Sequence, residues 1–147
     1  MSKKLKLTFC SLLGMFLVVL AQFFLPPFEE FIVSRGLFLI PLVAFSLLGA
    51  FLLFFVLKEE LPEKLRKSLF LMGASAAGFF IFVLLHNMFY ALEMVVGQII
   101  PLNYFAGVLH VISFLTAVLA CPLGFLFGTF WTLFLLSKEG RKIKKPS

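Results

Sequence analysis

The sequence predicts an all-α membrane protein, an antiparallel bundle of four transmembrane helices with both termini in the cytoplasm. This prediction rests on the composition, on four long apolar runs and on the placement of the basic residues. Of the 147 residues, 62% are hydrophobic and only 14% are charged, whereas a soluble domain holds roughly 45–50% apolar and about a quarter charged residues. Too little polar side chain remains to cover a surface in water. A soluble enzyme, a disordered tail and a nucleic-acid-binding module are therefore excluded.

The apolar residues fall into four runs, each long enough to cross a membrane as a helix. A hydrocarbon core of roughly 30 Å takes about 20 helical residues at about 1.5 Å each. A helix is expected because it satisfies its own backbone hydrogen bonds in lipid, and the polar–apolar alternation of barrel strands is absent. The predicted helices of this single membrane domain, 1–147, are 7–25, 36–57, 69–92 and 105–136.

The basic residues predict how the chain is threaded. All but one of the 13 Lys and Arg residues lie before the first predicted helix, between the second and third, or after the fourth. These are Lys3, Lys4, Lys6, Lys58, Lys64, Arg66, Lys67, Lys138, Arg141, Lys142, Lys144 and Lys145. Cytoplasmic loops of membrane proteins carry such an excess of positive charge. The pattern predicts a multi-pass protein of the cell (plasma) membrane with cytoplasmic N and C termini.

Two of the predicted cytoplasmic segments have a simple physical interpretation. We expect the basic tail, 137–147, to attract anionic lipid headgroups of the bilayer, at about 1 kcal/mol per Lys or Arg near the surface, and not nucleic acid. In the loop before the third helix, Pro62 favours a helix start at the next residue. Glu63 and Lys67 would then form an i,i+4 ion pair on a solvated face.

The first apolar run allows two interpretations. Residues 1–21 fit a secretory signal, with basic residues before an apolar stretch and the small residue Ala21 at its end. The apolar run nevertheless continues to Leu25 and reaches the length of a membrane span. We expect an intact first helix, and cleavage after Ala21 is the alternative.

Small residues predict where helices pack closely. Apolar burial does not drive helix association in lipid, whereas small residues allow backbones to approach. Gly124 and Gly128 form a G-x-x-x-G pair in the last predicted helix, and Gly73 and Gly78 bound a small-residue cluster in the third. We expect these two helices to pack on each other, with a homodimer contact as the alternative. Pro122 removes one backbone hydrogen bond and should kink the last helix.

Five polar residues in the third and fourth predicted helices form a candidate polar cluster. His86, Tyr90 and Glu93 follow at i, i+4 and i+7, which is one helix face, and Asn87 points about 100° away. His110, in the last helix, lies at the same predicted depth as His86, roughly 8 Å below the outer interface. Because the connection between the two helices is short, their side chains are expected to come within reach of one another.

Two interpretations of this cluster remain open. The favoured one is a set of hydrogen bonds that joins the ends of two helices, each worth about 0.6 kcal/mol in membranes. The alternative is a site in which His86 and His110 bind a transition metal or haem, with Tyr90 and Glu93 as orienting groups. The sequence has no H-x-x-x-H or C-x-x-C spacing that indicates a metal site.

The two cysteines are not expected to pair. Cys10 lies near the start of the first helix and Cys121 in the middle of the last. A disulfide requires Cα atoms within about 7 Å, and the predicted depths of these residues differ by more than that. We interpret both as small packing residues.

Three segments carry a resemblance to other proteins. Residues 73–78, 85–90 and 121–124, which include Gly73, Gly78 and the run from Leu85 to Tyr90, resemble small uncharacterised prokaryotic four-helix integral membrane proteins. The resemblance implies the fold and no reaction. It singles out His86, Asn87 and Tyr90 as residues to test.

Three functions are compatible with these features. The first is a non-enzymatic accessory or oligomerising membrane subunit, with a homo-oligomer or another membrane protein as partner. The second is a small transporter or channel that acts as an oligomer. The chain is similar in size and helix number to small multidrug transporters, but its first predicted helix holds no acidic residue. The third is a redox protein that binds metal or haem through His86 and His110.

Overall fold

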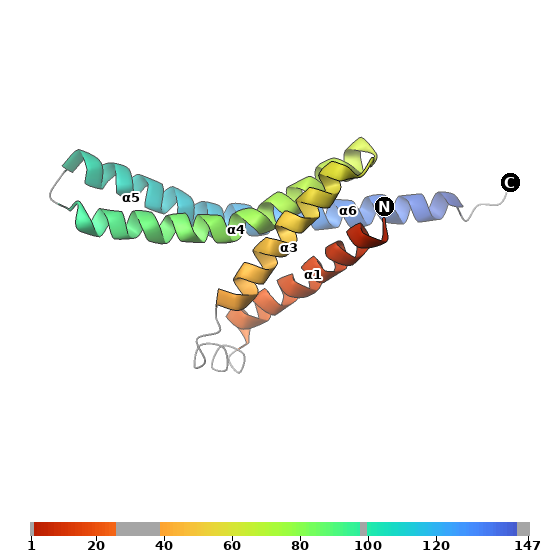
Figure 1. Ribbon diagram of the computed structural model, residues 1–147, viewed down its shortest axis with the longest axis horizontal. Helices are drawn as coiled ribbons and strands as arrows, with labels where there is room; N and C mark the ends of the chain where they lie inside the picture. The colour runs from red at the N-terminus through yellow and green to blue at the C-terminus, as the bar shows by residue number, and fades with distance from the viewer. Residues whose placement is uncertain (1, 26–38, 98–99, 144–147) are drawn as a thin grey trace.

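The computed structural model of the chain describes residues 2–25, 39–97 and 100–143, without the side chains of 139–143. Every regular element in these ranges is a helix, and four of the described helices are long and apolar enough to cross a membrane. This confirms the predicted class. Along the chain these are α1 (Lys3–Phe24), α3 (Leu39–Lys58), α4 (Glu63–Val95) and a last helix made of α5 (Ile100–Leu115), the π-helix η1 (Thr116–Ala120) and α6 (Cys121–Ile143) (Figure 1).

The first three helices differ from the predicted ones at their ends. α1 begins before the apolar run, where the Ser2 hydroxyl accepts a hydrogen bond from the backbone N–H of Leu5 at 3.2 Å. α4 begins directly after Pro62, and Lys67 and Glu63 form the predicted ion pair at 2.6 Å. The predicted start of the second helix, 36–38, lies outside the described residues.

The predicted boundaries at the far end of α4 and in the last helix were wrong. α4 continues to Val95, and the last helix begins at Ile100 instead of 105. α6 also continues to Ile143, so the predicted tail, 137–147, is helical over most of its length. Hydropathy marks where a chain suits lipid, whereas a helix satisfies its backbone hydrogen bonds on either side of that boundary.

The helices diverge and do not lie side by side over their whole lengths. α3 and α6 pack against the first half of α4, and α5 lies along its second half, while α1 packs on α3 (Figure 1). Within the described chain, no Cα atom of α1 or α3 comes within 8 Å of α5. We call the space between the α1–α3 pair and the α4–α5 pair the wedge. An apolar pocket of about 360 Å³, lined by Phe16, Phe79 and Val118 among others, lies at its closed end.

The α3–α4 contact depends on two glycines. A Cβ atom on Gly49 would lie 2.6 Å from the backbone nitrogen of Ala77 and 2.7 Å from the Cβ of Ala76. On Gly73 it would lie 3.0 Å from Leu53 of α3. The Ser46 hydroxyl donates to the Ala77 carbonyl across the same contact at 2.7 Å. Gly73 therefore packs on α3, and not on the last helix as expected.

The α4–α6 contact contains the G-x-x-x-G pair. A Cβ atom on Gly128 would lie 2.9 Å from the backbone of both Met72 and Ser68, and one on Gly124 would meet the Ser75 hydroxyl. A buried hydrogen bond from Thr132 to Ser68, 3.0 Å long, joins the same two helices. The glycines thus face α4 within one chain.

Gly78 is less closely packed than the four glycines described above. A Cβ atom there would lie 3.7 Å from the Phe82 ring and 3.8 Å from the Cys121 sulfur, which is ordinary van der Waals contact. Cys10 and Cys121 are both free, as predicted.

Pro122 is accommodated by a π-helical turn. The π-helix η1 ends just before this proline, and the backbone N–H of Cys121 bonds to the carbonyl of Thr116, five residues back. Prolines and π-bulges are both common where a helix departs from regular α geometry. With this wider turn, buried residues spaced by four remain on the side of α4. These are Ser113, Ala117, Cys121 and Phe125.

An aromatic cluster connects the first helix to the last. The Phe16 ring of α1 lies 4.5 Å from the Phe125 ring of α6 and 5.9 Å from that of Phe45 in α3, measured between centroids. Phe45 and Phe125 stand edge to face at 5.2 Å. These rings form the centre of the core beside the closed end of the wedge.

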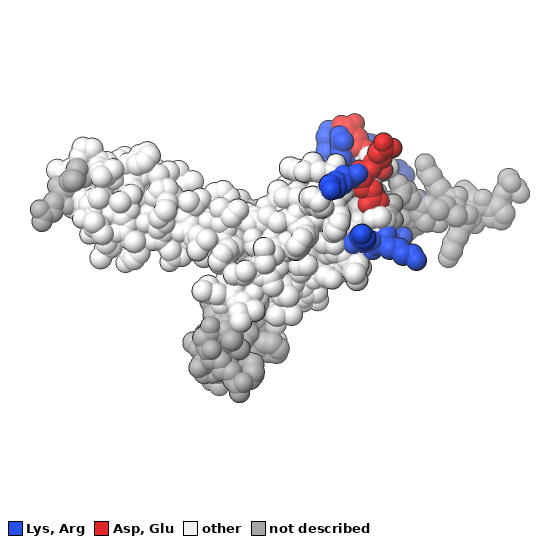
Figure 2. Space-filling model, viewed as in Figure 1, with Lys and Arg blue, Asp and Glu red and all other residues white. Residues whose placement is uncertain are grey.

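Most charged side chains of the described residues gather at one end of the molecule, and Glu93, near the far end of α4, is an exception. Figure 2 shows Lys, Arg and Glu side chains over the end where α1 begins, α3 ends and α4 begins. Ser2 bonds to the carboxylate of Glu59 at this end through both its backbone N–H and its hydroxyl. We call it the charged end.

Candidate functional site

The two histidines meet between α4 and α5. The ring centroids of His86 and His110 lie 4.4 Å apart at a tilt of 33°. The Nδ1 atom of His86 lies 3.3 Å from the backbone carbonyl oxygen of His110. A carbonyl oxygen can only accept, so this contact places the His86 proton on Nδ1. The sequence predicted the same depth for these two residues, and the structure shows that they are in contact.

Glu93 completes the contact with His110. Its carboxylate oxygen Oε2 lies 3.3 Å from the Nδ1 atom of His110. The two side chains are 36% and 23% exposed, respectively, so neither is sealed inside the protein. At this distance the imidazole and the carboxylate form a close polar pair that joins α4 to α5.

Aromatic side chains border the imidazole pair. The Tyr90 ring lies 5.3 Å from the His110 ring, and the Phe114 ring lies 5.2 Å from that of His86, between centroids. Tyr90 is half exposed and comes from the same face of α4 as His86 and Glu93. The four expected members His86, Tyr90, Glu93 and His110 therefore form one group.

Asn87, the fifth expected member, lies apart from this group. Its side-chain amide donates a 2.7 Å hydrogen bond to the backbone carbonyl of Val83 in its own helix, and its side chain is exposed. Within the described residues, the Asn87 side chain forms no hydrogen bond with either histidine. The helical offset of about 100° from His86 explains this separation.

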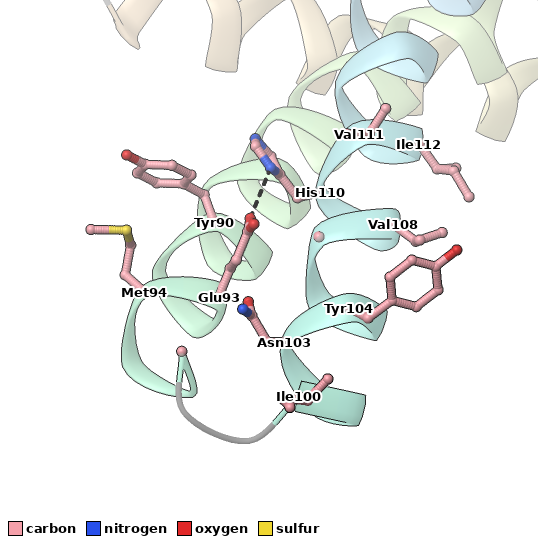
Figure 3. A pocket seen from close by; sticks show the side chains of 12 residues that line it. Tyr90, Glu93, Met94, Ile100, Asn103, Tyr104, Val108, His110, Val111 and Ile112 are labelled. Atoms are coloured by element: carbon pink, nitrogen blue, oxygen red, sulfur yellow. Dashed lines mark ion pairs between the residues drawn. The ribbon is translucent and has the colours of Figure 1, made fainter.

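A surface groove runs over Glu93 between the ends of α4 and α5. It has a volume of about 1050 Å³. We call it the α4–α5 groove. Figure 3 shows Glu93 and His110 pointing toward one another across it, with Tyr90 on one side and Tyr104 and Val108 on the other.

Gly107 and Asn103 shape the floor of the α4–α5 groove. A Cβ atom on Gly107 would lie 3.2 Å from Glu93 Oε1, so the absence of a side chain leaves this oxygen open. The Asn103 side chain extends from α5 toward α4 (Figure 3), and its buried Oδ1 atom has no hydrogen-bond partner in the described structure. The groove thus combines one carboxylate with other acceptor atoms.

The histidines are not arranged as part of a larger metal-ligand set. In the described ranges, no three or more His, Cys, Asp or Glu side chains lie where they could hold one metal ion. The two imidazole rings pack against each other at a tilt, and Nδ1 of each lies 3.3 Å from an oxygen atom. This arrangement joins two helices through polar contacts and ring contacts.

Sequence reasoning missed Asn103, Tyr104 and Gly107 as parts of this site. The last helix was predicted to begin at 105, which left Asn103 and Tyr104 in a loop. Asn103 and Gly107 precede His110 by seven and three residues, which is the spacing of one helix face. Extending the helix toward the nearest polar residues would have placed them beside His110.

No protein-family model, curated protein or solved structure matches this chain. Its function is therefore inferred from its own residues and geometry.

Proposed function

We propose that the chain is a non-enzymatic accessory or oligomerising subunit of the cell membrane, which takes a transmembrane helix of a second subunit into the wedge. The observation that carries this proposal is the exposed side chain of Asn87 on the face of α4 that borders the wedge. The second subunit is either another copy of this chain or a different membrane protein.

The position of Asn87 follows from the α3–α4 contact. Ala76 packs against Gly49 of α3, and Asn87 follows eleven residues later, about three helical turns along the same face. α3 packs on this face at Ala76. It diverges from the second half of α4 (Figure 1), which includes Asn87. A helix that enters the wedge would pack on the part of this α4 face that α3 does not cover.

The polarity of Asn87 supports a partner helix at this position. Polar side chains within membrane helices are costly when they face lipid, and they form hydrogen bonds across helix contacts. The amide N–H₂ of Asn87 already donates to Val83, and an amide has further donor and acceptor capacity. A polar group on an incoming helix would use that capacity.

We expect Asn87→Leu to weaken association with the second subunit. Interhelical hydrogen bonds in membranes contribute about 0.6 kcal/mol on average and up to about 1.7, so the dissociation constant should rise about three- to fifteen-fold. Native mass measurement after purification in a gentle detergent reports the complex directly. Ser11→Leu, at an exposed position of α1, is the matched control. A solitary wild-type monomer in detergent and in nanodiscs would contradict the proposal.

The proposed threading is antiparallel, with both termini in the cytoplasm. It is supported by the gathering of the described basic side chains at the charged end (Figure 2) and by the positive-inside rule. The exposed Lys138 and the basic residues that follow it would then reach anionic headgroups of the cytoplasmic leaflet.

We expect a membrane-impermeant amine reagent, applied to intact cells, to leave Lys142, Lys144 and Lys145 unmodified. The reason is that these amines would lie behind the membrane. Peptide mass mapping of the recovered protein measures the modification. The same reagent applied to opened cells is the control and should modify them. Modification in intact cells would reverse the proposed threading.

A further inference from the structure

We propose that the α4–α5 groove binds a primary ammonium group on an apolar chain, with Glu93 as its counter-ion. Two sources share this chemistry: the headgroup of an aminophospholipid and a free long-chain amine. The inference goes beyond the proposed function and does not depend on what enters the wedge.

The groove presents a carboxylate oxygen that a donor could reach. The Oε2 atom of Glu93 lies 3.3 Å from His110 Nδ1, and the Oε1 atom of Glu93 lies beside Gly107, which has no side chain to cover it. The buried Oδ1 of Asn103 has no hydrogen-bond partner within the described residues. A carbonyl or phosphate oxygen placed beside Glu93 Oε1 would be a further acceptor, whereas an ammonium group there brings three N–H donors.

The acidic side chain of the groove, Glu93, favours a cation as the ligand. Among the residues that the structure describes, Glu93 is the only acidic one that lines the groove, and none of the lining residues is Lys or Arg. Tyr90 and Tyr104 border the groove on opposite sides, 51% and 76% exposed, with their rings directed away from Glu93 (Figure 3). Hydrogen bonds between an ammonium and a carboxylate are among the stronger ones in proteins.

The apolar side chains of the groove suit the rest of such a ligand. Ile100, Val108 and Ile112 line the α5 side and are exposed. The volume of about 1050 Å³ exceeds what an ammonium group alone would occupy. The apolar part of the ligand can therefore leave along α5 into the surrounding lipid.

The depth of Glu93 matches the level of lipid headgroups. Glu93 follows Lys67 by 26 residues in one continuous helix, which corresponds to about 39 Å. A hydrocarbon core is roughly 30 Å thick. With Lys67 at one membrane surface, Glu93 reaches the headgroup region of the other, where aminophospholipids carry their ammonium groups.

The first arm of the test uses the full-length protein in nanodiscs of equal parts phosphatidylethanolamine and phosphatidylcholine. The two headgroups differ because one ammonium has three N–H groups and the other has none. Native mass spectrometry counts the bound lipids of each kind. The second arm titrates the protein in detergent with dodecylammonium and with dodecyltrimethylammonium.

We expect dodecylammonium to bind with one-to-one stoichiometry and more tightly than its trimethyl analogue. Glu93→Gln should weaken this binding about tenfold to a hundredfold, because it removes one charge-assisted contact. Glutamine keeps the size of the side chain and can still accept the His110 N–H. Gly107→Val places methyl groups next to Oε1 of Glu93. It should weaken binding because these groups occupy the space that the ammonium would fill. Glu60→Gln, which removes the same charge from the exposed loop before α4, should leave binding unchanged.

The two arms separate the two sources. A preference for phosphatidylethanolamine that Glu93→Gln abolishes would support the site and assign the lipid. Dodecylammonium binding without a lipid preference would support the site and assign a free amine. Equal binding of the trimethyl analogue would overturn the assignment of a primary ammonium. Binding that Glu93→Gln leaves unchanged, or no binding in either arm, would overturn the site.

Discussion

Gly49→Ala is expected to destabilise the protein by about 1–3 kcal/mol, the usual cost of overpacking a closely packed site. The added Cβ atom would meet the Ala77 nitrogen at 2.6 Å and the Gly73 carbonyl oxygen at 2.9 Å. Both are backbone atoms, which no rotamer change can move. α3 and α4 would have to separate, and the hydrogen bond from Ser46 to Ala77 would lengthen with them. Unfolding by dodecyl sulfate in mixed micelles measures the loss.

Gly14→Ala is the matched control for this substitution. Gly14 also lies within a helix that is long and apolar enough to span a membrane, but a Cβ atom there would have nothing within 4 Å. The change should be neutral or stabilise the protein by up to about 1 kcal/mol, because alanine has the higher helix propensity. Equal effects at the two glycines would show that helix propensity, and not the α3–α4 contact, determines the result.

Gly128→Ala is expected to have a similarly large effect at the α4–α6 contact. Its Cβ atom would lie 2.9 Å from the Met72 nitrogen and from the Ser68 carbonyl oxygen. Separation of the helices would also stretch the buried hydrogen bond between Thr132 and Ser68. A destabilisation of about 1–3 kcal/mol should result, measured by the same unfolding experiment.

The other glycine of the G-x-x-x-G pair provides the comparison. A Cβ atom on Gly124 would meet the Ser75 hydroxyl, which can rotate away, and the next nearest atoms lie at 3.5 Å and 3.7 Å. Gly124→Ala should therefore cost less than Gly128→Ala. The reverse order would mean that the two glycines do not contact α4 as described.

The sequence was sufficient to predict the helices but not their divergence. Hydrophobic runs identify spans because lipid demands both an apolar surface and a helical backbone. The apolar surface does not indicate which spans are in contact, because an apolar side chain gains little free energy when it exchanges a lipid contact for a protein contact. Gly49, which forms the tightest α3–α4 contact, belongs with Ser46 and Ala50 to a group of small residues that was not recognised as a packing face.

Part of the candidate site was likewise predictable. His86, Tyr90 and Glu93 share a helical face by spacing alone, and the equal depth of His110 followed from counting residues. Asn103 and Gly107 were missed because polar and small residues near an apolar run resemble a loop. The wider π-turn before Pro122 had no sequence signature beyond the proline itself.

The divergence of the helices also has a consequence for the bilayer itself. Four helices that converge at the charged end and separate at the other displace unequal cross-sectional areas in the two leaflets. The broad end of the protein, away from the charged end, fills area in a leaflet that curvature has stretched, and so lowers the elastic energy of that leaflet. As long as no other helix occupies the gap, the protein should concentrate in membranes that curve toward its narrow end.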